Sequence, residues 1–510
     1  MKKNNTMLGS AVLVAMVMLF SKCLGFIRQT VIATVYGSNL DTDIYFMSSE
    51  FMIGLSGALL SSLTTLLITK YVETRIKKNQ EASNAIASNM LTMFLLISIF
   101  LIGIINIGAF PLARMLAPSY DYFALSRLVL YLRFFSVTFL FTSFQSIYAA
   151  ILNANNSFTP GKLYGLVYNP IAIISVIFFG RFGIMPLIYA YIIANILQTL
   201  LLKFLCRKIF KYKFSFHFWN EDIKQVVVLT FPLLLSNIFI QLNTIIDKSI
   251  CSTLGEGFAS YYSYAFTLEQ FVTGIITTTI SLILLPRYAT YIAKNNNDGV
   301  IDTFKKSVTG LVLLLAPIAI ITFVFAYDIV KIVYLRGNFT STDALHTSYA
   351  LIGFAVGFCI IAIREMYVRL HFSYEDTKKP MIANIVSVII NAVFSIVLSR
   401  YIGVMGVSLA TSVSAIVTIC MLNKSLKKYI PEFKFLNFLS FFVKIVLSGT
   451  IALLVAITLN NILECSLIIK FIISAILVMI SYVSSLTLLN CEEFVSFLTS
   501  VKAKLLVKKA

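Results

Sequence analysis

The stretch ASNAIASNMLTMFLLISIFLIGIINIGAFPLA, residues 82–113, contains 32 consecutive residues without a charged side chain. An α-helix needs about 20 mainly apolar residues to cross the hydrocarbon core of a bilayer, so this stretch can form one membrane span. The rest of the chain has a similar composition, since 59% of its 510 residues are hydrophobic and 12% are charged. That charged share is about half the usual share of a soluble domain. The composition therefore excludes a soluble enzyme, a nucleic-acid-binding module and a disordered scaffold, and predicts an all-α polytopic membrane protein.

Apolar runs separated by polar residues, glycine or proline predict about 14 transmembrane helices. They fall near residues 8–35, 43–71, 85–112, 122–153, 160–180, 184–204, 225–252, 258–286, 305–334, 345–372, 379–399, 403–423, 436–459 and 466–489. The even-numbered loops and both chain ends carry most of the lysines and arginines, whereas the odd-numbered loops carry few. Because positive residues favour the cytoplasmic side, we expect both termini in the cytoplasm.

Two segments about 220 residues apart resemble each other. Residues 181–183 read Arg-Phe-Gly after Pro160, and residues 400–403 read Arg-Tyr-Ile-Gly after Pro380. Unless this similarity is chance, it predicts two six-helix lobes related by a pseudo-two-fold axis along the membrane normal, plus two extra C-terminal helices. The predicted parts are residues 1–220 with an amphipathic linker at Lys203–Asp222, residues 221–430, and residues 431–510 with an amphipathic cytoplasmic tail at Glu492–Ala510.

Charged residues inside predicted spans are candidate functional residues, because a charge in the bilayer is costly. The alternatives for each are a neutralising ion pair or a side chain that reaches the headgroups. A cation-bearing cleft between two apolar lobes suits an anion with a greasy portion, such as a diphosphate headgroup on a lipid tail. We therefore predict a substrate-binding set that comprises Lys22, Arg28, Asp43, Glu50, Glu269 and Arg364. No metalloprotease, P-loop or nucleophile-elbow motif is present, so we expect a transporter without catalytic residues.

Several ordered motifs resemble the MurJ/MviN family of lipid II flippases, in the multidrug/oligosaccharidyl-lipid/polysaccharide exporter superfamily. The motifs are residues 21–28 (SKCLGFIR), 33–37 (ATVYG), 42–46 (TDIYF), 151–154 with 158–160, Asp247 with 252–255, 264–265, 284–287, 336–339, 376–380 and 406–412. The resemblance implies fourteen helices, alternating access and export of undecaprenyl-diphosphate-linked peptidoglycan precursor (lipid II) across the bacterial cytoplasmic membrane. The implied partners are the lipid-linked glycan, membrane lipids and the cell-wall synthesis machinery.

The resemblance also implies a sodium ion as coupling ion, with no other cofactor. The site maps onto Asp247, Asn391, Ser395, Val407 through its carbonyl, and Thr411. Asn391 with Ser395, and Val407 with Thr411, are i,i+4 pairs that each present oxygens on one helix face. Ser395 stands where the family has an acid, so ordinary interhelical hydrogen bonding is the alternative.

Other positions depart from the family pattern. Lys22 replaces an arginine and Gln29 an acid, and the arginines expected in spans two and eight correspond to Ser56 and Thr267. Glu269 lies one residue before the family's glutamate position, which is Gln270 here. Either Lys248 or Arg364 compensates for the missing charge, or the cargo differs. The alternatives are an exporter of another polyprenyl-linked polysaccharide or a drug, and a non-transporting scaffold of cell-wall synthesis.

Overall fold

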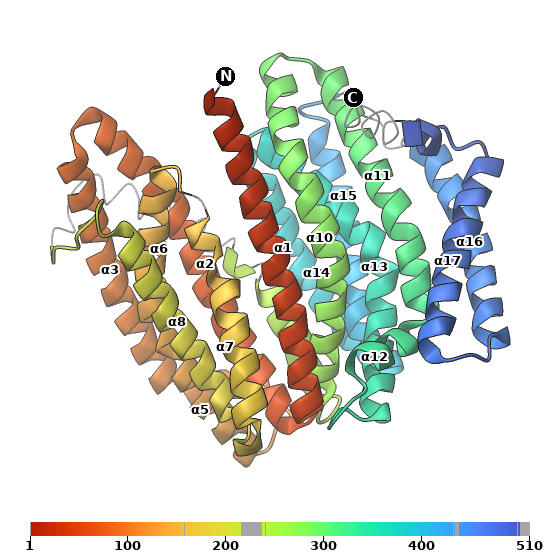
Figure 1. The fold of residues 1–510 in the computed structure, drawn as a ribbon, viewed down its shortest axis with the longest axis horizontal. Helices are drawn as coiled ribbons and strands as arrows, with labels where there is room; N and C mark the ends of the chain where they lie inside the picture. Colours follow the sequence, from red (N-terminus) through yellow and green to blue (C-terminus); the bar gives the residue numbers. More distant parts are fainter. Residues whose placement is uncertain are drawn as a thin grey trace. The chain divides into compact units, whose positions relative to one another are not determined.

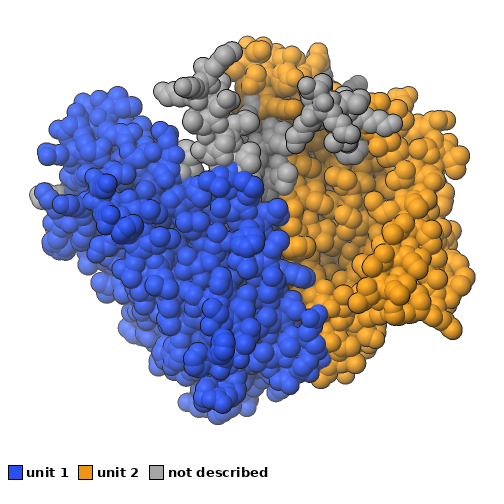
Figure 2. All heavy atoms as spheres, in the orientation of Figure 1, with its two compact units in different colours: residues 1–260, 336–339 blue, residues 261–335, 340–510 orange. Residues whose placement is uncertain are grey.

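The computed structural model describes residues 2–157, 159–215, 237–239, 241–431, 433, 438–496 and 498–499, and this part of the chain is helical without β-strands. It divides into two compact units (Figure 2). Unit 1 comprises Met1–Ser260 and Arg336–Phe339, and unit 2 comprises Tyr261–Leu335 and Thr340–Ala510.

Unit 1 is a bundle of long helices with short connections (Figure 1). Its elements are α1 (Lys2–Tyr36), α2 (Leu40–Lys77), α3 (Gln80–Ile107), α4 (Ala109–Leu116), α5 (Tyr122–Ser136), α6 (Thr138–Ala154), η1 (Pro160–Lys162), α7 (Tyr164–Phe179), η2 (Gly180–Phe182), α8 (Met185–Cys206) and helical residues 241–252.

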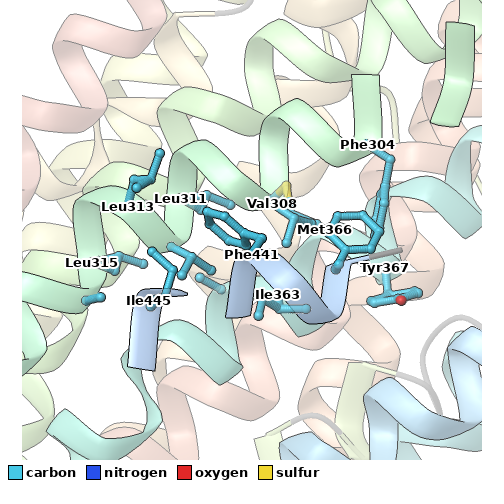
Figure 3. Close-up of a cluster of buried hydrophobic side chains, with 14 of the residues drawn as sticks. Phe304, Val308, Leu311, Leu313, Leu315, Ile363, Met366, Tyr367, Phe441 and Ile445 are labelled. Carbon is cyan, nitrogen blue, oxygen red and sulfur yellow. The ribbon is translucent and has the colours of Figure 1, made fainter. Parts of the chain in front are cut away.

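Unit 2 has the same all-helical construction. Its elements are α10 (Phe258–Ala293), whose first turn belongs to unit 1, then α11 (Asn297–Val324), α12 (Ala326–Tyr334), α13 (Ser341–Ser373), α14 (Lys378–Ile402), α15 (Val404–Leu426), α16 (Leu439–Ile462) and α17 (Leu467–Leu488). Figure 3 shows part of its core, where Phe441 and Ile445 of α16 lie among side chains of α11 and α13. The two C-terminal helices are therefore part of unit 2.

Twelve segments of the described residues are long and apolar enough to cross a membrane. They correspond to twelve of the predicted spans. The other two, 225–252 and 258–286, include positions whose backbone or side chains are not described. Helix α10 nevertheless has 36 residues, well beyond the ~20 that a span requires.

Two predicted spans were wrong in detail. The prediction at 305–334 covers two helices, because α11 ends at Val324 and the separate helix α12 follows Phe325. The prediction at 85–112 likewise runs past the end of α3 into α4, where Pro111 in the first turn lacks the N–H that a continuous helix requires. The predicted span 122–153 is confirmed as one candidate span, Tyr122–Ala154, in which α5 and α6 meet at Val137.

The order of elements agrees with the predicted internal repeat. A short helix, α4 or α12, follows the third long helix of each series, and a tight turn joins the last two helices. The turn between α7 and α8 contains Gly183 with φ +82°, and the turn between α14 and α15 contains Gly403 with φ +60°. Glycine adopts this left-handed region without the steric cost of a Cβ atom, which explains why both turns carry it.

The predicted division at residue 220 falls outside the described residues, and the predicted domain bounds stay a prediction. Unit 1 extends to Ser260. The described part of the predicted linker packs on α3, where the Tyr212 hydroxyl lies 2.9 Å from that of Thr92. The remainder of the linker and the tail beyond residue 499 lie outside the described residues, as does Phe158 of the family motifs.

Helices α1 and α7 pack closely along their length. A Cβ atom at Gly165 would collide with the Ser21 hydroxyl, and one at Gly180 would lie 2.7 Å from a methyl group of Val35. Small residues on α7 therefore allow the two backbones to approach closely, as at other membrane helix interfaces. This packing fixes the position of α1 and of the side chains it carries.

Residues 336–339 hold the C-terminal end of α1. The Asn338 N–H donates to the Thr34 carbonyl at 2.8 Å, and its side-chain amide donates to the Val35 carbonyl at 2.6 Å. Both carbonyls lie in the last turn of α1, where intrahelical donors are lacking. Gly337 has φ +61°, and a Cβ atom there would collide with the Thr34 carbonyl. Only glycine allows this close approach without rearrangement.

We expect Gly337→Ala to lower the melting temperature of the purified protein more than Gly183→Ala does. Both substitutions place alanine in a left-handed conformation, which costs about 1 kcal/mol. Gly183 has open space around it, whereas Gly337 contacts α1. Equal shifts in the two melting curves would show that the contact between residues 336–339 and α1 contributes nothing to stability.

Candidate functional site

Arg28 of α1 is a half-buried cation that forms no ion pair with a carboxylate of the described residues. Glu50, whose ion pair is with Lys248, interacts with it electrostatically. Its guanidinium carbon lies 4.8 Å from the centroid of the Tyr168 ring on α7. Its Nε is buried and has no hydrogen-bond partner in the described part of the chain. The neighbouring Gln29 is also buried, and it is neutral where the family has an acid. Arg28 therefore retains hydrogen-bond donors that an anion could use.

Tyr168 belongs to a cluster of four tyrosines in unit 1, with Tyr45, Tyr164 and Tyr191. The Tyr45 and Tyr168 hydroxyl oxygens are 3.0 Å apart. The ring of Tyr168 stacks on that of Tyr164 with centroids 5.8 Å apart, and meets that of Tyr191 edge-on at 5.3 Å. Tyr45, Tyr168 and Tyr191 are at most 4% exposed. The arrangement joins α2, α7 and α8 beside Arg28 of α1.

The sequence analysis did not single out these tyrosines. A signal existed, because Tyr164 and Tyr168 are i,i+4 neighbours on one face of a helix. The composition hid it, since 25 tyrosines and 43 phenylalanines occur in the chain and most pack as ordinary core residues.

Glu50 and Lys248 form an ion pair inside unit 1. Lys248 is 2% exposed, and its ammonium nitrogen lies 5.5 Å from the centroid of the Phe46 ring. Glu50 thus supplies the charge that a buried lysine requires, and the pair joins α2 to residues 241–252. This arrangement favours the alternative in which Glu50 forms a neutralising ion pair. Because Glu50 neutralises Lys248, the lysine compensates poorly for a missing arginine.

Asp43 is fully buried in the first turn of α2 and receives four hydrogen bonds from protein groups. Its carboxylate accepts from the Gly257 and Ser260 N–H groups at 2.7 Å each, from the Ser260 hydroxyl at 2.5 Å and from the Tyr120 hydroxyl at 2.9 Å. The two N–H groups belong to the start of α10, which a carboxylate stabilises. Burial and the Asp43 charge raise the pKa of Tyr120 well above its ordinary value, so Tyr120 stays a donor. The Asp43 carboxylate therefore connects α2 to Tyr120 and to the start of α10 within unit 1, which is a structural role.

The remaining predicted substrate-binding residues have local contacts. Glu269 in α10 is buried and accepts hydrogen bonds from Thr273 at 2.6 Å and from Gln270 at 2.8 Å. Arg364 pairs with the adjacent Glu365 at 3.0 Å. Lys22 is half-buried on α1, six residues before Arg28 and therefore on a different face of the helix. Substrate binding by these residues stays a prediction.

The residues of the expected sodium site belong to different units. Asp247 is buried in unit 1, and Asn391, Ser395, Val407 and Thr411 are in unit 2. The Asn391 amide donates to the Thr411 hydroxyl at 3.3 Å, and the Ser395 hydroxyl donates to the Asn391 carbonyl at 3.2 Å. These four unit 2 residues offer neutral oxygens only, and the side chains of Asn391, Ser395 and Thr411 already bond one another. The charge of the expected set comes from Asp247 alone, and sodium binding stays a prediction.

A groove of about 480 Å³ lies between α7 and α8. Its lining is apolar apart from Ser175 and Tyr189, and the Ser175 hydroxyl already donates to the Pro186 carbonyl at 2.8 Å. The groove has no charged lining residue and is unsuited to a diphosphate.

Comparisons with known proteins agree on one family. The family model described as "Lipid II flippase MurJ" matches residues 32–489. A protein of Bdellovibrio bacteriovorus named "Probable lipid II flippase MurJ" is 27% identical over 353 residues, which cover 66% of each chain, slightly under two thirds.

Two solved structures show the same fold. "Lipid II flippase MurJ, inward closed conformation" has a TM-score of 0.80 at 24% identity, and covers 93% of this chain and 98% of that chain. An inward-facing multidrug resistance MATE family transporter of the MOP superfamily has a TM-score of 0.69 at 13% identity, and covers 82% of this chain and 100% of that chain. The all-α, two-lobe membrane fold is thus shared with both. Since the family model matches most of its length, the chain belongs to the MurJ family.

Proposed function

We propose that this protein is a flippase that moves lipid II from the inner to the outer leaflet of the bacterial cytoplasmic membrane by alternating access. The observation that carries the proposal is Arg28, a guanidinium within a candidate membrane span that forms no ion pair with a carboxylate of the described residues. A diphosphate provides the oxygen pairs that a guanidinium binds bidentately. Family membership and the name of the Bdellovibrio protein support the same substrate.

The membrane potential provides a driving force for this cargo. A charge that crosses the membrane gains about 2.3 kcal/mol per 100 mV. An anionic diphosphate moves outward across a membrane that is negative inside, so the potential favours release in the outer leaflet.

The topology of the proposed flippase follows from the loop charges. The lysine- and arginine-rich even loops place both termini in the cytoplasm. Lipid-linked substrate and membrane lipids are then its direct partners. The cell-wall synthesis machinery, which uses the exported precursor, is a further proposed partner.

Two residues support a second class of cargo. Ser56 and Thr267 stand where the family carries arginines, so fewer cations contact a diphosphate. A related polyprenyl-diphosphate glycan is therefore the competing substrate. Purified protein in liposomes, tested against a panel of polyprenyl-linked glycans, separates this cargo from lipid II.

We expect Arg28→Ala to reduce lipid II flipping in liposomes at least tenfold. A charge-assisted hydrogen bond contributes about 1.5–3 kcal/mol, and 1.4 kcal/mol corresponds to a factor of ten. The rate is measured as the accessibility of the headgroup to a membrane-impermeant reagent. Arg127→Ala is the matched control, because Arg127 pairs with Asp41 at a partly exposed position. Undiminished flipping by Arg28→Ala in a stable protein would contradict the proposal and favour a scaffold.

The Glu50–Lys248 pair gives a separate expectation. Glu50→Gln alone leaves a buried lysine unpaired and should destabilise the protein by about 3–5 kcal/mol. The double variant Glu50→Gln with Lys248→Met removes both charges and should regain most of the stability and the flipping rate. A stable double variant without activity would instead assign Lys248 to the substrate.

We infer that flipping does not require sodium, because the side chains of Asn391, Ser395 and Thr411 in the expected ion site are neutral and hydrogen-bonded to one another. Replacing sodium with potassium on both sides of the liposome should change the rate by less than about twofold, within the scatter of weak ion effects. Ser395→Asp restores an acid and should make the rate more sensitive to sodium than the parent. A strong sodium requirement in the parent protein would refute the inference.

A further inference from the structure

We infer that Tyr168, held by Tyr45, is a positioning residue that presents the Arg28 guanidinium to the diphosphate of the lipid substrate. The inference rests on the proposed function, because it assigns a role to a neighbour of the proposed anion-binding residue. It extends the site from one cation on α1 to a set of aromatic residues on α2 and α7.

The geometry connects the three side chains directly. The Arg28 guanidinium lies over the Tyr168 ring at 4.8 Å, and the Tyr168 hydroxyl lies 3.0 Å from that of Tyr45. Tyr45 is 3% and Tyr168 is 4% exposed, so neither ring has room to swing away. The stacked ring of Tyr164 further limits the movement of Tyr168.

An aromatic face holds an arginine differently from a carboxylate. A carboxylate accepts hydrogen bonds in the plane of the guanidinium and occupies the donors that a phosphate requires. A ring attracts the cation through its face and leaves the in-plane N–H groups available. Tyr168 therefore stabilises the charge of Arg28 without competing for its hydrogen bonds.

The hydroxyl pair fixes the ring that holds the arginine. A tyrosine ring can rotate about two side-chain torsions, but a buried hydrogen bond at its far end selects one orientation. Tyr45 supplies that bond from α2, whereas Arg28 comes from α1 and Tyr168 from α7. The guanidinium is thus oriented by contacts that reach three helices.

The test measures lipid II binding to the purified protein by native mass spectrometry, together with the dependence of the flipping rate on lipid II concentration. We expect Tyr168→Leu to raise the dissociation constant and the half-saturating concentration about three- to thirtyfold, the range expected for a lost cation–π contact. Tyr168→Phe keeps the ring and should stay within about threefold of the parent, the factor that a loosened neutral hydrogen bond can produce.

Tyr191→Leu is the matched control. Tyr191 is a buried member of the same cluster and contacts the Tyr168 ring, whereas the Arg28 guanidinium lies over the ring of Tyr168. Melting temperatures are measured for all variants, so that a loss of packing is seen separately. Equal losses of binding in Tyr191→Leu and Tyr168→Leu would reduce the role of Tyr168 to packing and overturn the inference.

A double-mutant comparison separates the inference from the proposed function. If Tyr168 acts through Arg28, then adding Tyr168→Leu to Arg28→Ala should cause no further loss of binding. A further loss equal to that of Tyr168→Leu alone would show that Tyr168 acts independently.

If Arg28→Ala itself binds and flips lipid II normally, the proposed function fails. If Arg28→Ala is defective but Tyr168→Leu is normal, only the positioning role fails. A Tyr168→Phe defect as large as that of Tyr168→Leu would show that the hydroxyl, not the ring, is required.

Discussion

A charge inside a membrane span must be stabilised by its neighbours, because bulk water is not available to solvate it. Unit 1 meets this requirement in three ways. Asp43 accepts four protein hydrogen bonds, and Lys248 pairs with Glu50. Arg28 lies over the ring of Tyr168. The first two arrangements use the hydrogen-bonding capacity of the charged group within the protein, whereas the third leaves the in-plane donors of the guanidinium for another molecule.

The contact between Arg28 and Tyr168 depends on how α1 packs. Gly165 of α7 and Gly180 of η2 let the α1 backbone approach closely, and Asn338 bonds the carbonyls at the end of α1. A helix held along its side and at its end has little freedom to slide or rotate. The distance between a side chain on α1 and one on α7 is therefore set by backbone contacts well away from either residue. Small residues in the interface thus set the position of Arg28 relative to Tyr168.

Much of the fold could be predicted from the sequence, because hydropathy reports directly on burial in a bilayer. The separation of α11 from α12 and of α3 from α4 could not, since helix ends depend on local hydrogen bonds that leave hydropathy unchanged. The same limit applies to the site. Arg28 and Glu50 were identifiable as buried charges, but the choice of Tyr168 and Lys248 as their neighbours is made by tertiary packing between residues far apart in the sequence.

The departures from the family pattern change charge in a correlated way. Ser56 and Thr267 replace arginines, while Gln29 and Ser395 replace acids. Loss of the acids alone, or of the arginines alone, would leave buried charges without a partner. Loss of both keeps the free-energy cost of burying charge low. Fewer charges also mean that each one left has a larger share of substrate recognition. In such a protein an arginine held by an aromatic ring is more useful than one held by an acid, because its donors remain available when the lipid arrives.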